Sequence, residues 1–157
     1  GGGTLRDLLI GAPVFWVSTN ATLVICSIAA VLVWIGRRKR FAGPALLWFD
    51  AAGMAAYATY GSAKALGFGV APVPAFVMGV LTACAGGIIR DVLAGVPSAL
   101  MRRELYVTCA ALAAALYVAL HFFGASAWLA TAIAIAAGFI LRGGAIARGW
   151  SLPTYAD

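Results

Sequence analysis

Apolar residues fill long stretches of this chain, and short polar or glycine-rich segments separate them. A membrane-spanning helix needs about 20 mostly apolar residues, and five stretches approach or exceed that length. We expect spans at residues 14–35, 44–64, 74 to the segment beginning at 86, 105–123 and 125–141. Residues 67–74 contain two glycines and two prolines, which predicts a loop, and residues 142–157 are expected to form a tail with little fold of its own. The pattern therefore predicts an all-α, polytopic membrane protein.

The composition supports the same class. Hydrophobic residues make up 64% of the chain and charged residues 10%, whereas a soluble domain is about half apolar and about a quarter charged. The net charge of +6 would suit a nucleic-acid-binding protein, but the cations lie at the ends of apolar spans and form no basic stripe on a polar domain. We therefore expect membrane lipids, including an anionic leaflet, as the surroundings and no nucleic-acid partner.

The positions of the cations orient the spans. Lys and Arg gather at alternate span ends, at residues 37–40, 102–103, 142 and 148. The segment 65–74 and the loop around Gly124 carry none. Because cytoplasmic loops are enriched in Lys and Arg, all the cationic ends are expected on the cytoplasmic side. The sequence thus predicts a multi-pass protein of the cell inner membrane with a cytoplasmic C-terminus.

Two segments of the chain are nearly the same. Residues 1–13 read GGGTLRDLLIGAP, and residues 86–97 read GGIIRDVLAGVP. An offset of 84 residues aligns identical residues at seven positions of the first copy: Gly2, Gly3, Arg6, Asp7, Leu9, Gly11 and Pro13. After the first copy no cation appears until Arg37, whereas Arg102 and Arg103 closely follow the second. These opposite charge contexts predict two repeats inserted in opposite directions across the membrane.

The repeat also divides the chain into three parts. Residues 1–43 would be the remainder of a first repeat, residues 44–123 a second repeat of three helices, and residues 124–157 a final helix with its tail. The second repeat begins about forty residues before its glycine motif, at Pro44. A matching first repeat would need an additional helix, and half of the next, before Gly1. We therefore expect an architecture of two inverted three-helix repeats plus a final helix, of which this chain lacks the beginning.

The glycine runs of the two motifs are candidates for a functional site. They consist of Gly1, Gly2, Gly3, Gly86 and Gly87. Each glycine inside a helix costs about 1 kcal/mol relative to alanine, so paired glycines suggest a kink that lines a conduit and frees carbonyl groups. The alternative is close helix packing. The occurrence of the feature in both repeats favours the conduit.

An arginine and an aspartate follow each glycine run, as Arg6–Asp7 and Arg90–Asp91. These charges could neutralise each other at a helix end, or they could form a charged vestibule or a structural lock beside the kink. Adjacent residues do not face each other on a helix. We therefore expect each arginine to pair with a group on another segment.

A polar stripe runs along the span at residues 44–64. Asp50, Tyr57, Gly61 and Lys64 are spaced by 7, 4 and 3 residues, and Met54 falls on the same helical face. A polar face on an apolar helix is expected to contact protein or water instead of lipid. Lys64 could extend to the outer headgroups, or it could place a positive charge at the wall of a conduit as a gating element.

No arrangement typical of an enzyme is visible. The sequence contains no Ser/His/Asp set at a suitable spacing, no phosphate-binding loop and no cluster of metal ligands. Cys26, Cys84 and Cys109 each lie in an apolar run, and we expect all three to be buried free thiols. The prediction is a protein without catalytic activity, metal or cofactor.

These motifs resemble the prokaryotic trimeric intracellular cation channel family, some members of which are labelled glycine transporters. The resemblance covers most of the chain between Gly1 and Tyr106. It is carried by GGGTLRDLLIG at 1–11, DAAGMAAY at 50–57, GSAKAL at 61–66, GGIIRDVLAGVP at 86–97 and RRELY at 102–106.

The resemblance implies a seven-helix protomer, a homotrimer with one pore in each protomer, and conduction of potassium or other monovalent cations. It also implies that Gly1–Gly3 lie on the second helix and Gly86–Gly87 on the fifth, both kinked and lining the pore. The function expected is a potassium-permeable channel. Two alternatives remain open from the sequence: a secondary transporter of a small zwitterion such as glycine, since inverted repeats also suit alternating access, and a packing module without transport.

Overall fold

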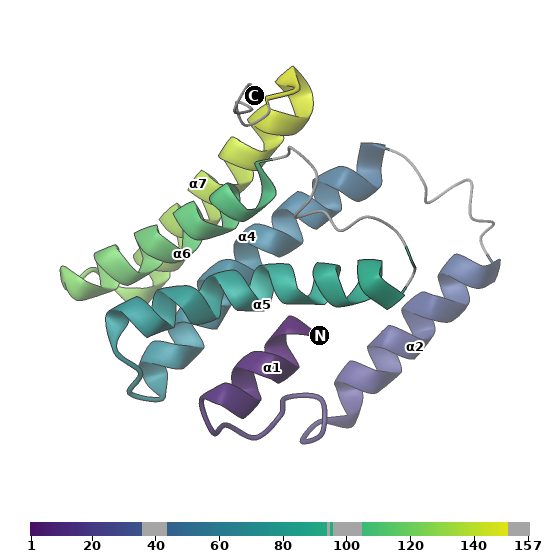
Figure 1. The fold of residues 1–157 in the computed structure, drawn as a ribbon, viewed down its shortest axis with the longest axis horizontal. Helices are drawn as coiled ribbons and strands as arrows, with labels where there is room; N and C mark the ends of the chain where they lie inside the picture. The colour runs from purple at the N-terminus through teal and green to yellow at the C-terminus, as the bar shows by residue number, and fades with distance from the viewer. Residues whose placement is uncertain (36–43, 94, 96–104, 151–157) are drawn as a thin grey trace, which may run out of the picture.

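The computed structural model describes residues 1–35, 44–93, 95 and 105–150. Within these ranges the regular structure is entirely helical, which confirms the predicted all-α class (Figure 1). The helices are α1 (Gly2–Leu9), α2 (Asn20–Ile35), α4 (Pro44–Gly67), α5 (Pro72–Leu93), α6 (Tyr106–Phe122) and α7 (Ala127–Arg148).

Helix α4 is the centre of the bundle and packs against α5, α6 and α7, while α1 packs on α5. Its buried face consists largely of small residues, among them Ala51, Ala55, Ala58 and Ser62. Small side chains let helix backbones approach closely, so this bundle is held by short-range packing. Helix α2 lies at the edge of the bundle (Figure 1).

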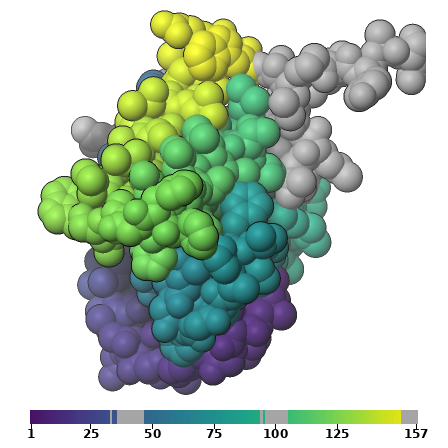
Figure 2. Space-filling view, turned by 90° about the vertical axis from the view of Figure 1, so that its left-hand side faces the viewer, coloured from purple at the N-terminus to yellow at the C-terminus, as the bar shows by residue number. Residues whose placement is uncertain are grey.

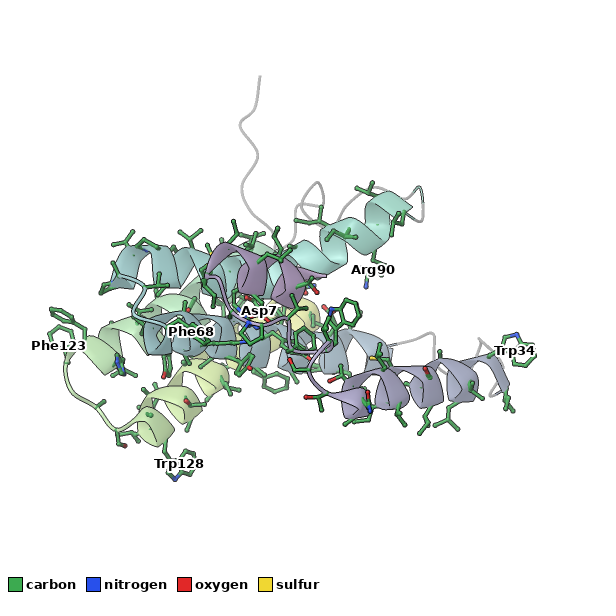
Figure 3. All side chains as sticks on the ribbon, turned by 90° about the horizontal axis from the view of Figure 1, so that it is seen from below. Asp7, Trp34, Phe68, Arg90, Phe123 and Trp128 are labelled. Atoms are coloured by element: carbon green, nitrogen blue, oxygen red, sulfur yellow. The ribbon has the colours of Figure 1, made fainter. Side chains whose placement is uncertain are left out.

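The turn between α4 and α5 and the turn between α6 and α7 lie at the same end of the molecule. Figure 2 looks onto this end and shows the two turns, in teal and light green, side by side. Phe123 and Trp128 flank the α6–α7 turn and project away from the bundle, with 82% and 79% of their surface exposed (Figure 3). Exposed aromatic rings at helix ends are typical of a membrane interface.

The two glycine motifs lie on helices that run in opposite directions. Helix α1 runs from the centre of the molecule toward the end with the two turns, and α5 starts at that end and runs away from it (Figure 1). The inverted relation predicted from the charge pattern is therefore confirmed.

Two described helices, Pro72–Leu93 and Ala127–Arg148, are long and apolar enough to cross a membrane by the criteria of length and hydropathy. Asn20–Leu32 and Tyr106–Phe122 are shorter apolar helices. Large apolar side chains on α2 are exposed, for example Trp34 at 85% and Ile35 at 68%. Such a surface suits lipid better than water.

The first predicted span begins later than expected. The prediction placed its start at residue 14, but residues 15–18 form turns and α2 begins at Asn20. The polar residues Ser18 and Thr19 directly precede the helix. Short hydroxyl side chains compete with helical hydrogen bonding and favour the residues just before a helix.

The last helix is longer than expected. The predicted tail began at Arg142, but α7 continues to Arg148 and ends at Gly149, which adopts a left-handed conformation (φ 66°). A Cβ atom on Gly143 would lie 2.7 Å from the Trp48 ring, and one on Gly144 would lie 2.8 Å from the Trp150 ring. Both glycines are thus packed against indole rings, and the prediction of an unstructured segment here was wrong for residues 142–148.

Arg142 was expected to begin a tail with little fold, but it lies within α7 and is buried, with 4% of its surface exposed. Its guanidinium carbon lies 5.2 Å from the centre of the Tyr106 ring. The cation–π contact provides a favourable environment for the charge beside the bundle core. The other cationic segments of the charge map, at residues 37–40 and 102–103, lie outside the described residues.

Candidate functional site

The glycine motifs of the two repeats meet where α1 crosses α5. A Cβ atom on Gly1 would lie 2.7 Å from the Cα atom of Gly86, and one on Gly2 would lie 2.7 Å from the carbonyl oxygen of Leu81. No side chain fits at either position. Helix α5 itself is helical through Gly86 and Gly87, so the glycine pair does not end the helix. The close-packing interpretation of these glycines therefore applies to Gly1, Gly2 and Gly86.

A cavity of about 640 Å³ lies beside this crossing, between α1, α2, α4 and α5. Residues of both glycine motifs line it, namely Gly1, Gly2, Gly3, Gly86 and Gly87. A Cβ atom on Gly87 would meet nothing within 4 Å, so this residue faces open space. The two interpretations of the glycine runs are therefore compatible, because one glycine of α5 packs on α1 while the next faces the cavity.

Only part of the polar stripe of α4 lines the cavity, and the rest contacts α1 and α5. Asp50, Met54 and Tyr57 line the cavity, together with Gly53 and Tyr60. The sequence pattern thus identified the cavity-facing side of the first half of α4. Tyr60 was missed, although it follows Tyr57 by one helical turn.

Gly61 belongs to the stripe but packs against α5. A Cβ atom on Gly61 would lie 2.5 Å from the Thr82 hydroxyl oxygen and 2.9 Å from the Cα atom of Gly79. A Cβ atom on Gly79 would in turn collide with the Ser62 hydroxyl and the Ala58 carbonyl oxygen. This is the closest backbone approach between α4 and α5 among the described glycines.

Arg6, Asp7 and Lys64 form a buried charge cluster between α1 and α4. The Arg6 guanidinium donates to Asp7 Oδ1 from Nη2 at 2.7 Å and from Nε at 2.9 Å. The Lys64 ammonium donates to the same oxygen at 2.8 Å. The backbone N–H of Phe15 donates to Asp7 Oδ2 at 3.1 Å. One carboxylate thus accepts hydrogen bonds from two cations and from the turn that follows α1.

The cluster is shielded from solvent. The side chains of Arg6 and Asp7 are 1% and 0% exposed, and that of Lys64 is 17% exposed. The Arg6 guanidinium carbon lies 5.0 Å from the centre of the Tyr60 ring, and Arg6 Nη1 is buried without a hydrogen bond. Figure 3 shows Asp7 in the interior of the bundle. With two cations and one anion, the cluster carries a net charge of +1.

The expectation that each arginine pairs with another segment was wrong. Arg6 pairs with the adjacent Asp7, and Arg90 Nη2 lies 2.9 Å from Asp91 Oδ1. The long arginine side chain folds back far enough to reach its neighbour's carboxylate, although the two Cβ atoms point in different directions. The contact between segments is made by Lys64, whose ammonium binds Asp7.

The second charge pair has a different setting from the first. The side chain of Arg90 is 68% exposed and that of Asp91 is 7% exposed. Figure 3 shows Arg90 toward the far end of α5, away from Asp7. The equivalent motif residues therefore form the same local pair, but only the first pair is enclosed by the bundle.

The cysteines are not equivalent. Cys84 and Cys109 are buried as expected, but Cys26 is exposed and lines the cavity from α2. The prediction failed for Cys26 because an apolar sequence does not distinguish a helix face in the core from one that faces a cavity or lipid.

Exposed apolar helix faces, two oppositely directed glycine motifs and a cavity lined by residues of both motifs are the features of a polytopic helical membrane protein. A family model described as "Glycine transporter" matches residues 1–38 and 47–122. The chain belongs to this family.

The relatives in sequence are bacterial membrane proteins. A UPF0126 membrane protein of Vibrio cholerae is 39% identical over 99% of this chain and 66% of its own length. The UPF0126 inner membrane protein YadS of Escherichia coli K12 is 32% identical over 99% of this chain and 77% of its own length. The chain thus spans about two thirds to three quarters of these relatives, and it is membrane-embedded as they are.

Solved structures share the fold. The trimeric intracellular cation channel (TRIC) orthologue from Rhodobacter sphaeroides is 44% identical and superimposes with a TM-score of 0.86 over 96% of this chain and 78% of its own. A second structure, described in terms of conductance through TRIC cation channels, is 27% identical with a TM-score of 0.90 over 100% of this chain and 78% of its own. These matches confirm the family resemblance identified from the motifs.

Proposed function

We propose that the whole protein is a passive channel for monovalent cations, with potassium as a permeant ion. The observation that carries this proposal is the cavity at the crossing of the two glycine motifs, which Asp50 and Tyr57 also line, in a fold shared with TRIC cation channels. The proposed conduit is lined by Gly1–Gly3, Gly86, Gly87, Asp50 and Tyr57. The ends of the conduit are proposed to be formed by charged residues, namely Arg6, Asp7, Lys64, Arg90 and Asp91.

The charges in and beside the cavity support a channel over a binding site for glycine. A glycine zwitterion carries its two charges on either side of a single carbon atom. Asp50 and Tyr60 are ten residues apart on α4, which corresponds to about 15 Å along the helix axis. Arg6 lies against Tyr60 and is bound to Asp7. Arg90, the other guanidinium of the lining, is bound to Asp91, so neither arginine is paired with Asp50 as a site for one small zwitterion.

The organisation of the whole protein is part of the proposal. Residues 1–43 complete a first repeat, residues 44–123 form the second, and residues 124–157 form the final helix and its end. The proposed assembly is a homotrimer with a conduit in each protomer; the Rhodobacter sphaeroides orthologue is described as trimeric. The proposed location is the inner membrane, since YadS of Escherichia coli is described as an inner membrane protein.

The experiment is single-channel recording of the full-length protein in planar bilayers with potassium chloride. We expect sustained unitary currents. The variant Gly87→Leu should abolish or strongly reduce them, since its side chain would enter the open space at Gly87 without displacing a neighbour. Gly67→Leu is the matched control, because Gly67 is exposed, has equal space and does not line the cavity.

Three results would contradict the proposal. Saturable glycine uptake coupled to an ion, without unitary current, would favour the secondary transporter. Absence of any flux from proteoliposomes that contain the full-length protein would favour the packing module. Unchanged conductance of Gly87→Leu in well-folded protein would remove the cavity from the conduction path.

A further inference from the structure

Among the described residues that line the cavity, one charged side chain has no ion pair with another described residue. Three of the cavity's described lining residues have a charged side chain, namely Arg6, Asp50 and Arg90. Arg6 is bound to Asp7, and Arg90 is bound to Asp91. Among the described residues no cation lies within ion-pair distance of Asp50. Both cationic groups at the lining therefore have an anionic partner, whereas the Asp50 carboxylate has none.

The position of Asp50 separates it from the positive cluster. Tyr60, whose ring contacts Arg6, lies about 15 Å further along α4. The cavity thus has the +1 cluster of Arg6, Asp7 and Lys64 beside one part and an uncompensated carboxylate at the other. A charge in a cleft with low-dielectric walls produces a focused potential that raises the local concentration of oppositely charged ions.

We propose that Asp50 is the residue that makes this cavity attractive to cations and excludes anions, in a chain whose net charge is +6. Monovalent metal cations are the class of ligand, since a single carboxylate among tyrosine and glycine residues offers few of the oxygen ligands that a divalent ion takes. The inference rests on the conduit of the proposed function, but the potential at Asp50 exists whether or not ions flow.

The Cys26 thiol provides a probe of that potential. Cys26 is exposed and lines the same cavity, and Cys84 and Cys109 are buried. We would compare the rates at which a cationic and an anionic methanethiosulfonate modify Cys26 in the full-length protein, measured by mass spectrometry. The cation-to-anion rate ratio should fall in Asp50→Asn, because the carboxylate accelerates the cationic reagent and slows the anionic one. For scale, a unit charge at about 10 Å in water alters each rate about twofold and the ratio about fourfold.

Two controls isolate the charge of Asp50. Asp50→Glu retains the carboxylate and should retain the ratio. In a Cys26→Ala background, Gly67→Cys places a thiol at an exposed position that does not line the cavity. The rate ratio at this thiol should be the same whether residue 50 is Asp or Asn.

The outcomes distinguish this inference from the proposed function. An unchanged ratio at Cys26 in Asp50→Asn would overturn the inference even if the protein conducts potassium. Failure of both reagents to modify Cys26 would overturn it as well, since the cavity would then hold no water. A reduced ratio in a protein without unitary currents would support the role of Asp50 and refute the channel. In a conducting protein, Asp50→Asn should also move the reversal potential in a potassium chloride gradient toward zero.

Discussion

At the scale of single residues, the feature that distinguishes this molecule is the carboxylate of Asp7. It is fully buried and accepts hydrogen bonds from Arg6, Lys64 and the backbone of Phe15. It therefore connects α1, the turn after α1 and the C-terminal half of α4. Buried ion pairs contribute little net stability compared with apolar residues, but removing one partner leaves a buried charge without compensation.

The first prediction concerns this carboxylate. Asp7→Asn should destabilise the protein by about 3–5 kcal/mol, because Arg6 would remain buried and unpaired. Lys64→Met should cost less, since Lys64 is partly exposed and the pair of Arg6 with Asp7 would remain. Thermal unfolding of the full-length protein in detergent measures both effects. Equal losses for the two variants would contradict the central position of Asp7.

A double substitution provides a second check on the same cluster. Replacing Arg6 with Met and Asp7 with Leu removes both buried charges together. The double variant should be less destabilised than Asp7→Asn, because the fully buried Arg6 charge is removed together with its partner, and only the partly exposed Lys64 loses its carboxylate. A double variant that unfolds more readily would show that specific hydrogen bonds, and not charge compensation, dominate here.

At the scale of helices, the crossing of α4 and α5 depends on small residues of both helices. Gly61 lies against Thr82 and Gly79, and Gly79 lies against Ser62 and Ala58. The Thr82 hydroxyl donates to the carbonyl oxygen of Met78 at 2.6 Å, so its polar group is satisfied within α5. Small residues matter in a lipid environment because close van der Waals contact replaces much of the hydrophobic driving force between helices.

The second prediction compares two glycines of α5. Gly79→Ala should destabilise the protein by about 1–3 kcal/mol, because the new methyl group would collide with Ser62 and the backbone of α4. Gly87→Ala should be neutral or slightly stabilising, because its Cβ atom meets open space and alanine favours a helix. Thermal unfolding in detergent checks both. Similar melting temperatures for the two variants would argue against the close approach at Gly79.

At the scale of the whole molecule, the two inverted glycine motifs line a common cavity. The first glycine motif lies on α1 and the second on α5, and the two helices run in opposite directions in contact with each other (Figure 1). A pair of inverted elements produces a cavity near the middle of the bundle whose two ends are built from equivalent segments. The difference between those ends arises from the environment, since Arg6 is buried and Arg90 is exposed.

The third prediction concerns orientation in the membrane. A fluorescent protein fused after residue 157 should fold and fluoresce in the cytoplasm, whereas alkaline phosphatase at the same position should be inactive there. The reason is the enrichment of Lys and Arg at the ends proposed to be cytoplasmic. A fusion placed in the α4–α5 turn, at Gly69, should give the opposite pattern. This turn follows the C-terminal end of α4, whereas the cationic segment at residues 37–40 precedes its N-terminal end. Phosphatase activity at the C-terminal fusion would invert the proposed topology.

Much of the architecture follows from the sequence, because it depends on local hydrophobicity and on motifs. The apolar spans, the inverted relation of the two glycine motifs and the family were all predicted. The cavity-facing positions Asp50, Met54 and Tyr57 follow from helical periodicity. The helix boundaries at residues 14 and 141 were wrong, since polar residues before Asn20 and the indole rings beside Gly143 and Gly144 changed where the helices begin and end.

The sequence by itself determined that this protein is a helical membrane protein with two inverted repeats, since apolar length, charge placement and motif duplication are properties of the chain. Only the tertiary structure decided the partners of the charged and small residues. In the structure Lys64 binds Asp7, and Asp50 lines the cavity without an ion pair among the described residues. Gly86 packs against α1, whereas Gly87 faces open space. These outcomes depend on side-chain conformation and on which helix lies alongside, and neither is encoded in spacing along a single helix.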